Sequence, residues 1–236
     1  MHHLPALALC TWLGAAGAAA WAQASCSSDG QPPPAALYER FTSADCEDCW
    51  ASPSADIAPG NGTMVIDWIT PGALGDDAPL SAAATRDALE RLQAIGRPAP
   101  ARTDTRVDAI PLLPAPALLR VAQGPVLADY LGASVRFIPY RAAADAHYQL
   151  TLLVIEAIPA GSEGSQVARN LVRNTFQRTW EKRHKLSKKE QYGWFEIRPM
   201  SVPDGARPER LRVAAWVHDA RGHLVAAAQT RCDTGH

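Results

Sequence analysis

The hydrophobic pattern in the first half of the chain predicts two strands and one helix. Residues 37–42 and 63–69 are short runs of mainly apolar, β-branched or aromatic side chains, which favour strands. Over residues 81–95 apolar side chains recur at helical spacing, between Ser81, a suitable N-cap, and Gly96, a suitable stop. This order of strands and helix predicts an α/β arrangement for this part of the chain.

Beyond Gly124 the pattern predicts strands almost exclusively. Residues 167–179 also fit an amphipathic helix; their neighbours favour a strand, but both interpretations stay open. Residues 99–116 are interrupted by prolines, so we expect no long regular element there. The predicted strands are 134–138, 147–158, 167–179, 193–198, 210–217 and 223–230, the last two joined by a turn at 219–222.

These patterns predict two domains behind a leader and a short lead-in. Residues 1–24 are predicted to be a signal peptide and residues 25–36 a polar, proline-rich lead-in. Residues 37–124 are predicted to form an α/β domain, and residues 125–236 a β-rich, sandwich-like C-terminal half.

The N-terminus has the features of a cleaved signal peptide. Residues 4–20 form a run rich in Ala, Leu and Gly that is too short for a comfortable membrane span. Ala22-Gln23-Ala24 matches the small-x-small pattern of signal peptidase sites, so we expect cleavage after Ala24. The mature chain would then be periplasmic or secreted and would have no stable membrane span. A retained anchor helix is the alternative, because no Lys or Arg precedes the apolar run.

Composition argues against several classes of partner and chemistry. The 236 residues carry 23 Lys and Arg against 24 Asp and Glu, a formal net charge of -1, whereas nucleic-acid binders usually have a strong basic excess. The sequence contains no phosphate-binding loop, dinucleotide fingerprint or Gly-x-Ser-x-Gly motif, so nucleotide-dependent and hydrolase functions have no support. The histidines of the mature chain lie far in sequence from Cys46 and Cys49, and we expect neither a metal nor a cofactor.

Five cysteines carry most of the functional information. Cys10 leaves with the predicted leader, and four cysteines remain in a compartment that permits disulfides, with three connectivities available. Cys46 and Cys49 are spaced to close a small, reducible ring. We pair Cys26 with Cys232 as a staple between the chain ends, which would stabilise the fold by closing a long loop. The alternative is that all four cysteines are structural and inert.

The segment around Cys46 and Cys49 is the candidate redox site. A Cys-x-x-Cys pair between a strand and a helix can place its first sulfur at the helix N-terminus, where backbone N–H groups favour the thiolate. Cys46 would then attack a disulfide of a partner protein, and Cys49 would resolve the mixed disulfide. Asp45, Glu47 and Asp48 oppose this, because a negative charge about 6 Å from a thiolate costs it roughly 0.7 to 3 kcal/mol. We therefore expect the pKa of Cys46 to lie near or above that of a free thiol.

Three features together resemble the signature of a bacterial exported family of unknown function with a thioredoxin-like fold. They are residues 41–43 (Phe-Thr-Ser), the Cys46 and Cys49 pair, and residues 54–56 (Ser-Ala-Asp). The family signature has Phe-Thr-Ser, a glycine, Cys-x-x-Cys and then Pro-Pro-Ala-Asp. The resemblance implies a thioredoxin-like domain over residues 37–124 with a redox site at the two cysteines. It implies no substrate, because the family has no established reaction.

A catalytic site of that fold also needs a cis-proline facing the sulfurs. Ile110-Pro111 is the best candidate for this position, and an ordinary turn proline is the alternative interpretation of Pro111. The chain departs from the family signature beside the cysteines, with Asp45 in place of glycine and Trp50 in place of proline.

A local basic run and two histidines complete the candidate residues. The basic run could contact anionic lipid headgroups or an acidic partner, or it could be a solvated loop. His218 and His223 flank the predicted turn at 219–222, and we expect both to be exposed. The basic run consists of Arg178, Lys182, Arg183, Lys185, Lys188 and Lys189.

Two functions of different class remain. One is an exported thiol-disulfide oxidoreductase, with Cys46 as nucleophile, Cys49 as resolving cysteine and Pro111 shaping the groove beside them. The other is a non-catalytic envelope protein with structural disulfides, in which the β-rich half binds a protein or envelope partner. The acidic neighbours of Cys46 favour the second function, and the position of the cysteine pair after a strand favours the first.

Overall fold

The computed structural model describes most of the chain between Cys26 and Cys232. The predicted leader lies outside the described residues, as do residues 54–56 of the family signature and most of the basic run. The described residues are 26–52, 60, 62–111, 117–140, 147–181, 184–185 and 192–232.

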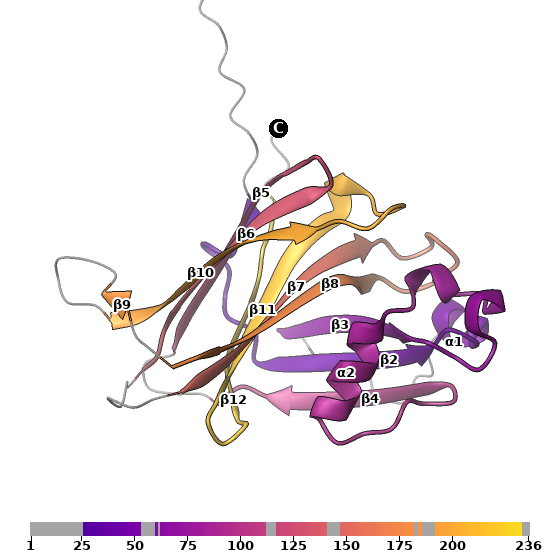
Figure 1. The fold of residues 1–236 in the computed structure, drawn as a ribbon, viewed down its shortest axis with the longest axis horizontal. Helices are drawn as coiled ribbons and strands as arrows, with labels where there is room; N and C mark the ends of the chain where they lie inside the picture. Colours follow the sequence, from indigo (N-terminus) through magenta and orange to yellow (C-terminus); the bar gives the residue numbers. More distant parts are fainter. Residues whose placement is uncertain are drawn as a thin grey trace, which may run out of the picture.

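The described strands form two sheets that stack face to face over part of their width (Figure 1). The smaller sheet has the order β1 (Cys26–Ser27), β5 (Leu118–Leu127), β6 (Tyr130–Ile138), β10 (Tyr192–Ser201) and β9 (His184–Lys185). The larger sheet has the order β12 (Leu224–Gln229), β11 (Leu211–Asp219), β7 (Tyr148–Ile158), β8 (Arg169–Trp180), β3 (Thr63–Thr70), β2 (Ala36–Ser43) and β4 (Thr103–Ala109). The helices are α1 (Glu47–Ala51) and α2 (Arg86–Ala94), with short 3-10 turns η1 (Gly75–Asp77), η2 (Ser81–Ala83) and η3 (Pro208–Arg210).

The predicted fold class, an α/β thioredoxin-like N-terminal domain followed by a sandwich-like C-terminal half, is wrong. Strands β2, β3 and β4 do not form a sheet of their own, because β8 pairs in parallel with β3 at Asp67 and Leu171 and joins them to the C-terminal strands. Strand β5 also runs through residue 124, where the boundary was expected. The prediction failed because it used only the order of strands and helix along the chain. That order does not show that β3 pairs with β8, a segment about a hundred residues away.

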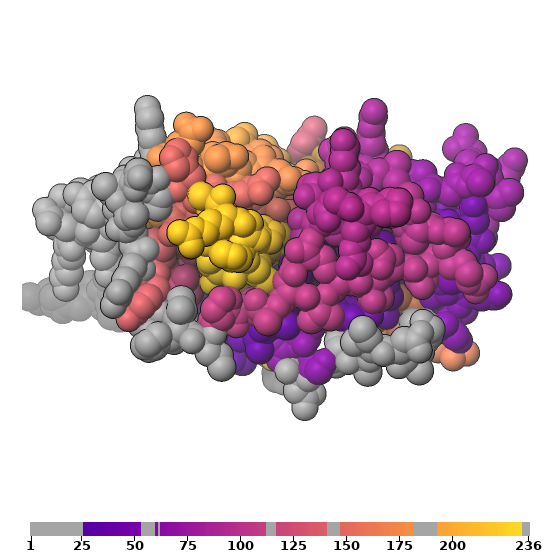
Figure 2. Space-filling model, turned by 90° about the horizontal axis from the view of Figure 1, so that it is seen from below, coloured from indigo at the N-terminus to yellow at the C-terminus, as the bar shows by residue number. Residues whose placement is uncertain are grey.

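Two apolar cores lie on opposite faces of the seven-stranded sheet. Strand β7 supplies both, since Leu152 and Val154 face the five-stranded sheet while Leu153 and Ile155 belong to the core beneath α2. A strand that is buried on both faces has a near-continuous apolar run, as β7 has over residues 152–155. The second core also joins α2 to the C-terminal hairpin, and Figure 2 shows the α2–β4 region (magenta) lying directly against that hairpin (yellow).

Most predicted strands of the second half are confirmed, and residues 167–179 lie in strand β8 rather than in a helix. The predicted helix is shorter than expected, because Thr85 rather than Ser81 is its N-cap and accepts a hydrogen bond from Ala88 N. Over residues 99–116, where no long regular element was expected, the structure has the seven-residue strand β4. Strand β4 occupies the proline-free stretch between the prolines, which lie at its flanks.

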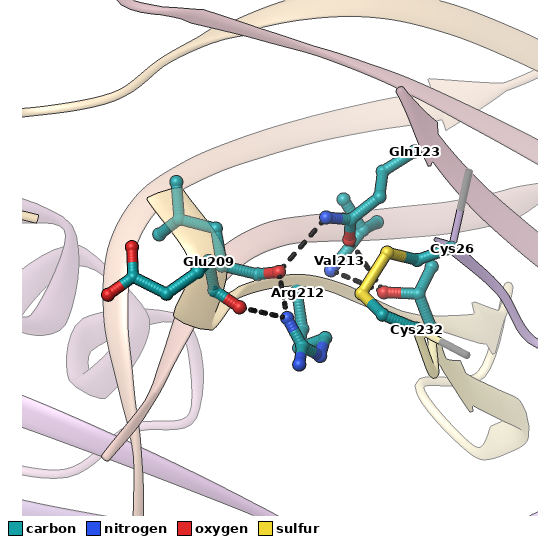
Figure 3. The surroundings of a disulfide bond; sticks show 8 residues. Cys26, Gln123, Glu209, Arg212, Val213 and Cys232 are labelled. Carbon is teal, nitrogen blue, oxygen red and sulfur yellow. Dashed lines mark hydrogen bonds between the residues drawn. A yellow bond between two sulfur atoms is a disulfide. The ribbon is translucent and has the colours of Figure 1, made fainter. Parts of the chain in front are cut away.

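The two sheets are joined along one side by a covalent seam. Cys26 and Cys232 form a disulfide with sulfur atoms 1.97 Å apart, as the sequence predicted. Beside it, Ser27 and Arg231 exchange backbone hydrogen bonds in both directions. Figure 3 shows Gln123 of β5 beside the disulfide, where its side chain donates to Leu211 O and accepts from Thr230 Oγ1. The seam thus combines a disulfide with buried, uncharged hydrogen bonds.

Candidate functional site around the Cys46–Cys49 disulfide

The candidate redox pair lies where β2 ends and α1 begins. Cys46 is the N-cap residue of this five-residue helix, and Cys49 lies within it. Their sulfur atoms are 1.94 Å apart, so the pair forms the expected disulfide. Only 6% of Cys46 and 7% of Cys49 is exposed, whereas the neighbouring Glu47 and Asp48 face solvent. The disulfide is therefore covered by protein, and the acidic side chains beside it point outward.

Asp45 is a structural clamp for the start of α1. Its carboxylate accepts hydrogen bonds from Ala73 N at 2.7 Å and Leu74 N at 3.2 Å. A Cβ atom on Gly72 would overlap this carboxylate, so the clamp needs glycine at that position. From the sequence, Asp45 was expected to oppose a thiolate and to replace the glycine of the family signature, whereas in the structure its carboxylate binds the next loop.

Arg169 holds the other end of α1. Its guanidinium donates hydrogen bonds to the carbonyl oxygens of Cys49 and Trp50, which lie in the last turn of the helix. It also donates to Ser165 Oγ and Asp67 Oδ1, and it lies 4.7 Å from the centre of the Trp50 ring. Because a cation near a helix C-terminus compensates the helix dipole and its free carbonyl groups, Arg169 fixes α1 to the sheet.

Asp67 is the anionic centre of this buried network. Its Oδ1 accepts from Arg40 Nε at 2.7 Å and from Arg169, and its Oδ2 accepts from Asn170 N at 2.8 Å. Arg40, Asp67 and Arg169 are all at least nine-tenths buried. Burial lowers the pKa of Arg169 from its ordinary value, and the Asp67 carboxylate acts in the opposite direction. One carboxylate thus compensates two buried guanidinium groups.

Pro111 does not face the cysteines. In the antiparallel pairing of β2 with β4, Thr42 lies opposite Thr103 and Ala36 lies opposite Ala109. Pro111 therefore follows the end of β4 that is remote from Cys46, about 20 Å or more away at the usual rise per strand residue. No cis peptide bond occurs among the described residues. The predicted role of Pro111 in shaping a thiol-facing groove is wrong.

A cavity of about 240 Å³ opens beside Trp50. The Trp50 indole Nε1 donates to Glu163 O at 2.7 Å, and Glu163 has a left-handed backbone with φ of 50°. The Glu163 carboxylate forms ion pairs with Arg207 and Arg210, which fix this wall to the loop before β11. The floor is mainly apolar, and the charged groups that line the cavity are Glu163, Arg173 and Asp204.

The other candidate residues are placed away from this site. His218, expected to be exposed, is only 6% exposed, because it lies within β11 near Arg91 of α2. Burial, followed by the positive charge of Arg91, lowers its pKa to about 4. His223 is exposed and lies 3.2 Å from Asp219 Oδ2. In the basic run, Arg178 pairs with Glu196 of β10.

The described residues give no direct support for a metal site or a membrane-spanning helix. Within them, no three His, Cys, Asp or Glu side chains are grouped so that they could hold a metal ion. None of their helices is long and apolar enough to cross a bilayer.

The groups that hold α1 in place were not predicted from the sequence. Arg169, Glu163 and Asp67 lie far from the cysteines in sequence, so spacing around the Cys-x-x-Cys motif could not identify them. One signal was present, because Asp67 interrupts an otherwise apolar strand. A buried carboxylate needs a partner, and a second charged residue that begins a strand, such as Arg169, is a natural candidate.

No family model matches the chain, and neither does any curated protein. Among solved structures, the chain is similar to HBP35 of Porphyromonas gingivalis, with 12% sequence identity and a TM-score of 0.47. That similarity covers 86% of this chain and 77% of the other. At this level it supports no conclusion about function, and the resemblance of the cysteine motif to an exported family stays a prediction.

Proposed function

We propose that this chain is an exported binding protein whose Cys46–Cys49 disulfide is structural. The observation that carries the proposal is the burial of both cysteines, which are 6% and 7% exposed. Thiol-disulfide exchange requires a thiolate to reach a sulfur atom, so a covered disulfide reacts only after local opening. The clamps made by Asp45 and Arg169 at the two ends of α1 oppose such opening.

Export is supported by the disulfides themselves. Disulfides persist in oxidising compartments and are rare where thiols are kept reduced. Cys26 and Cys232 close the seam between the sheets, so the fold depends on a compartment in which this bond can form. The predicted leader agrees with that location.

Two measurements test the proposal: the disulfide-reductase turnover of the protein and the reduction potential of its Cys46–Cys49 pair. We expect purified mature protein to show no turnover with a dithiol donor in a disulfide-reductase assay, and the Cys46→Ser variant to behave identically. We also expect the reduction potential of the Cys46–Cys49 pair to lie below about −300 mV, as in structural disulfides. Turnover in the unaltered protein that the Cys46→Ser variant loses would instead establish the oxidoreductase.

A matched control separates loss of activity from loss of structure. A Cys26→Ser/Cys232→Ser variant removes the other disulfide and leaves the candidate redox pair intact. If turnover were present and depended on Cys46, this control would retain it at temperatures at which the variant stays folded.

A further inference from the structure

The cavity beside Trp50 combines an apolar floor with a charged rim, which is the usual composition of a small-molecule site. Trp50, Ile69, Ile158 and Leu171 contribute to the floor. The volume of about 240 Å³ exceeds the size of an engineered cavity of about 150 Å³ that admits benzene. A ligand with one apolar branch of about the size of an aliphatic side chain therefore fits.

Arg173 presents a fixed guanidinium at the rim. Its Nε and one terminal nitrogen donate to Glu156 Oε2 at 2.8 Å and 2.6 Å, and Glu156 is completely buried. The second terminal nitrogen of Arg173 makes no hydrogen bond to any described residue. Because Glu156 fixes the plane of the guanidinium, this free edge is oriented before a ligand arrives and suits a carboxylate oxygen.

The acidic side of the rim has one carboxylate available. Glu163 is compensated by its ion pairs with Arg207 and Arg210. Asp204 is exposed and has no ion pair within the described part of the chain. The rim thus offers a free donor edge on Arg173 and an unpaired carboxylate on Asp204, next to an apolar floor.

We propose that this cavity binds a free aliphatic α-amino acid such as leucine. The ligand carboxylate lies on the free edge of Arg173, its ammonium group faces Asp204, and its side chain contacts Trp50 and the apolar floor. This assignment deepens the proposed binding function and rests on it. It uses both signs of charge at the rim, whereas a plain carboxylate or a plain amine would use only one.

Calorimetric titration of the mature protein with related probes tests the assignment. We expect L-leucine to bind, and we expect binding to weaken at least tenfold for leucinamide, which lacks the carboxylate. We expect a similar loss for 4-methylpentanoate, which lacks the ammonium group, and for glycine, which lacks the side chain. No heat of binding with L-leucine at millimolar concentration would overturn the proposal, as would equal affinity for all four probes.

Variants locate the binding at this cavity. Ala82 lines the cavity and is exposed, so Ala82→Phe should block leucine binding without a change in the thermal unfolding midpoint. Ala220→Phe, at an exposed turn at the other end of β11, should bind leucine normally. Asp204→Asn should remove the preference for leucine over 4-methylpentanoate. Unchanged leucine binding in Ala82→Phe would place the ligand elsewhere and overturn the assignment.

A result that contradicts leucine binding can be distinguished from a result that contradicts the proposed function. Absence of leucine binding leaves the redox assays of Cys46 unaffected, and the binding protein would then need another ligand. Turnover that depends on Cys46 would contradict the structural role of the disulfide, whatever the result of the titration.

Discussion

The two disulfides hold the chain in different ways. Cys26–Cys232 joins residues 206 positions apart and sits on a seam of backbone pairing and uncharged side-chain hydrogen bonds. Cys46–Cys49 joins residues only 3 positions apart and sits in a short helix that charged groups clamp at both ends. The seam therefore depends on its covalent bond, whereas the α1 region depends mainly on its buried charges.

Removal of the seam disulfide should have the largest effect. The chain-entropy model gives about 5 kcal/mol of stabilisation for a loop of this length, as an upper value, because strain and residual structure reduce it. We expect the Cys26→Ser/Cys232→Ser variant to lose a large share of this free energy of unfolding, measured by urea titration. An unfolding midpoint equal to that of the unaltered protein would show that the hydrogen bonds around Gln123 are sufficient to hold the seam.

Loss of the carboxylate at the centre of the α1 network should be almost as severe. Asp67→Asn leaves the buried guanidinium groups of Arg40 and Arg169 without their counter-ion, which typically costs about 3 to 5 kcal/mol. The matched control is Asp104→Asn, because Asp104 pairs with Arg97 at a partly exposed site, where an ion pair is worth about 1 kcal/mol or less. Equal losses in urea titrations of the two variants would contradict the importance assigned to burial.

Features of these two regions could be predicted from the sequence where they depend on local patterns, and not where they depend on contacts between segments far apart along the chain. The pairing of Cys26 with Cys232 could be inferred because few cysteines remained and their positions at the chain ends were informative. The strand β7 could be identified because an apolar run is a local signal. The parallel pairing of β3 with β8 could not, since Asp67 and Leu171 are about a hundred residues apart and strand patterns do not specify partners. The predicted thioredoxin-like domain is wrong because this pairing joins β3 to the C-terminal strands in one sheet.

The candidate site shows the same limit. The cysteine pair and its disulfide were predicted from spacing, but the burial of the sulfurs depends on contacts from other segments. Pro111 was selected by its place in the sequence, and the register of β2 with β4 puts it at the opposite end of the sheet. Asp45 was recognised as unusual, although its role required the position of Gly72 and the backbone N–H groups after it.

Acid should destabilise the fold at a place outside both disulfide regions. The pKa of His218 is about 4 in the folded state, against an ordinary value near 6.5, because burial and Arg91 disfavour its charged form. The unfolded chain therefore binds a proton below pH 6.5 that the folded chain binds only below about pH 4. The contribution of His218 to the free energy of unfolding is complete above about pH 6.5, and it falls by about 3 kcal/mol as the pH is lowered to about 4.

Urea titrations from pH 7.5 to pH 4 measure this loss. We expect His218→Gln to flatten the pH dependence, and we expect removal of either disulfide to leave the slope unchanged, because distant sites contribute independently. A His218→Gln variant with the same pH slope as the unaltered protein would assign the acid sensitivity to carboxylates instead.

Removal of the Cys46–Cys49 disulfide should have the smallest effect of the four. The chain-entropy model gives only about 2 kcal/mol for so short a loop, because the unfolded chain already keeps these residues close together. Asp45 and Arg169 would still hold the ends of α1, so the Cys46→Ser/Cys49→Ser variant should keep its fold, as judged by circular dichroism. A loss as large as that of the seam variant would mean that the charged clamps form only when the disulfide has already shaped α1. The charged network would then be a consequence of the short disulfide, and the contrast between the two regions would disappear.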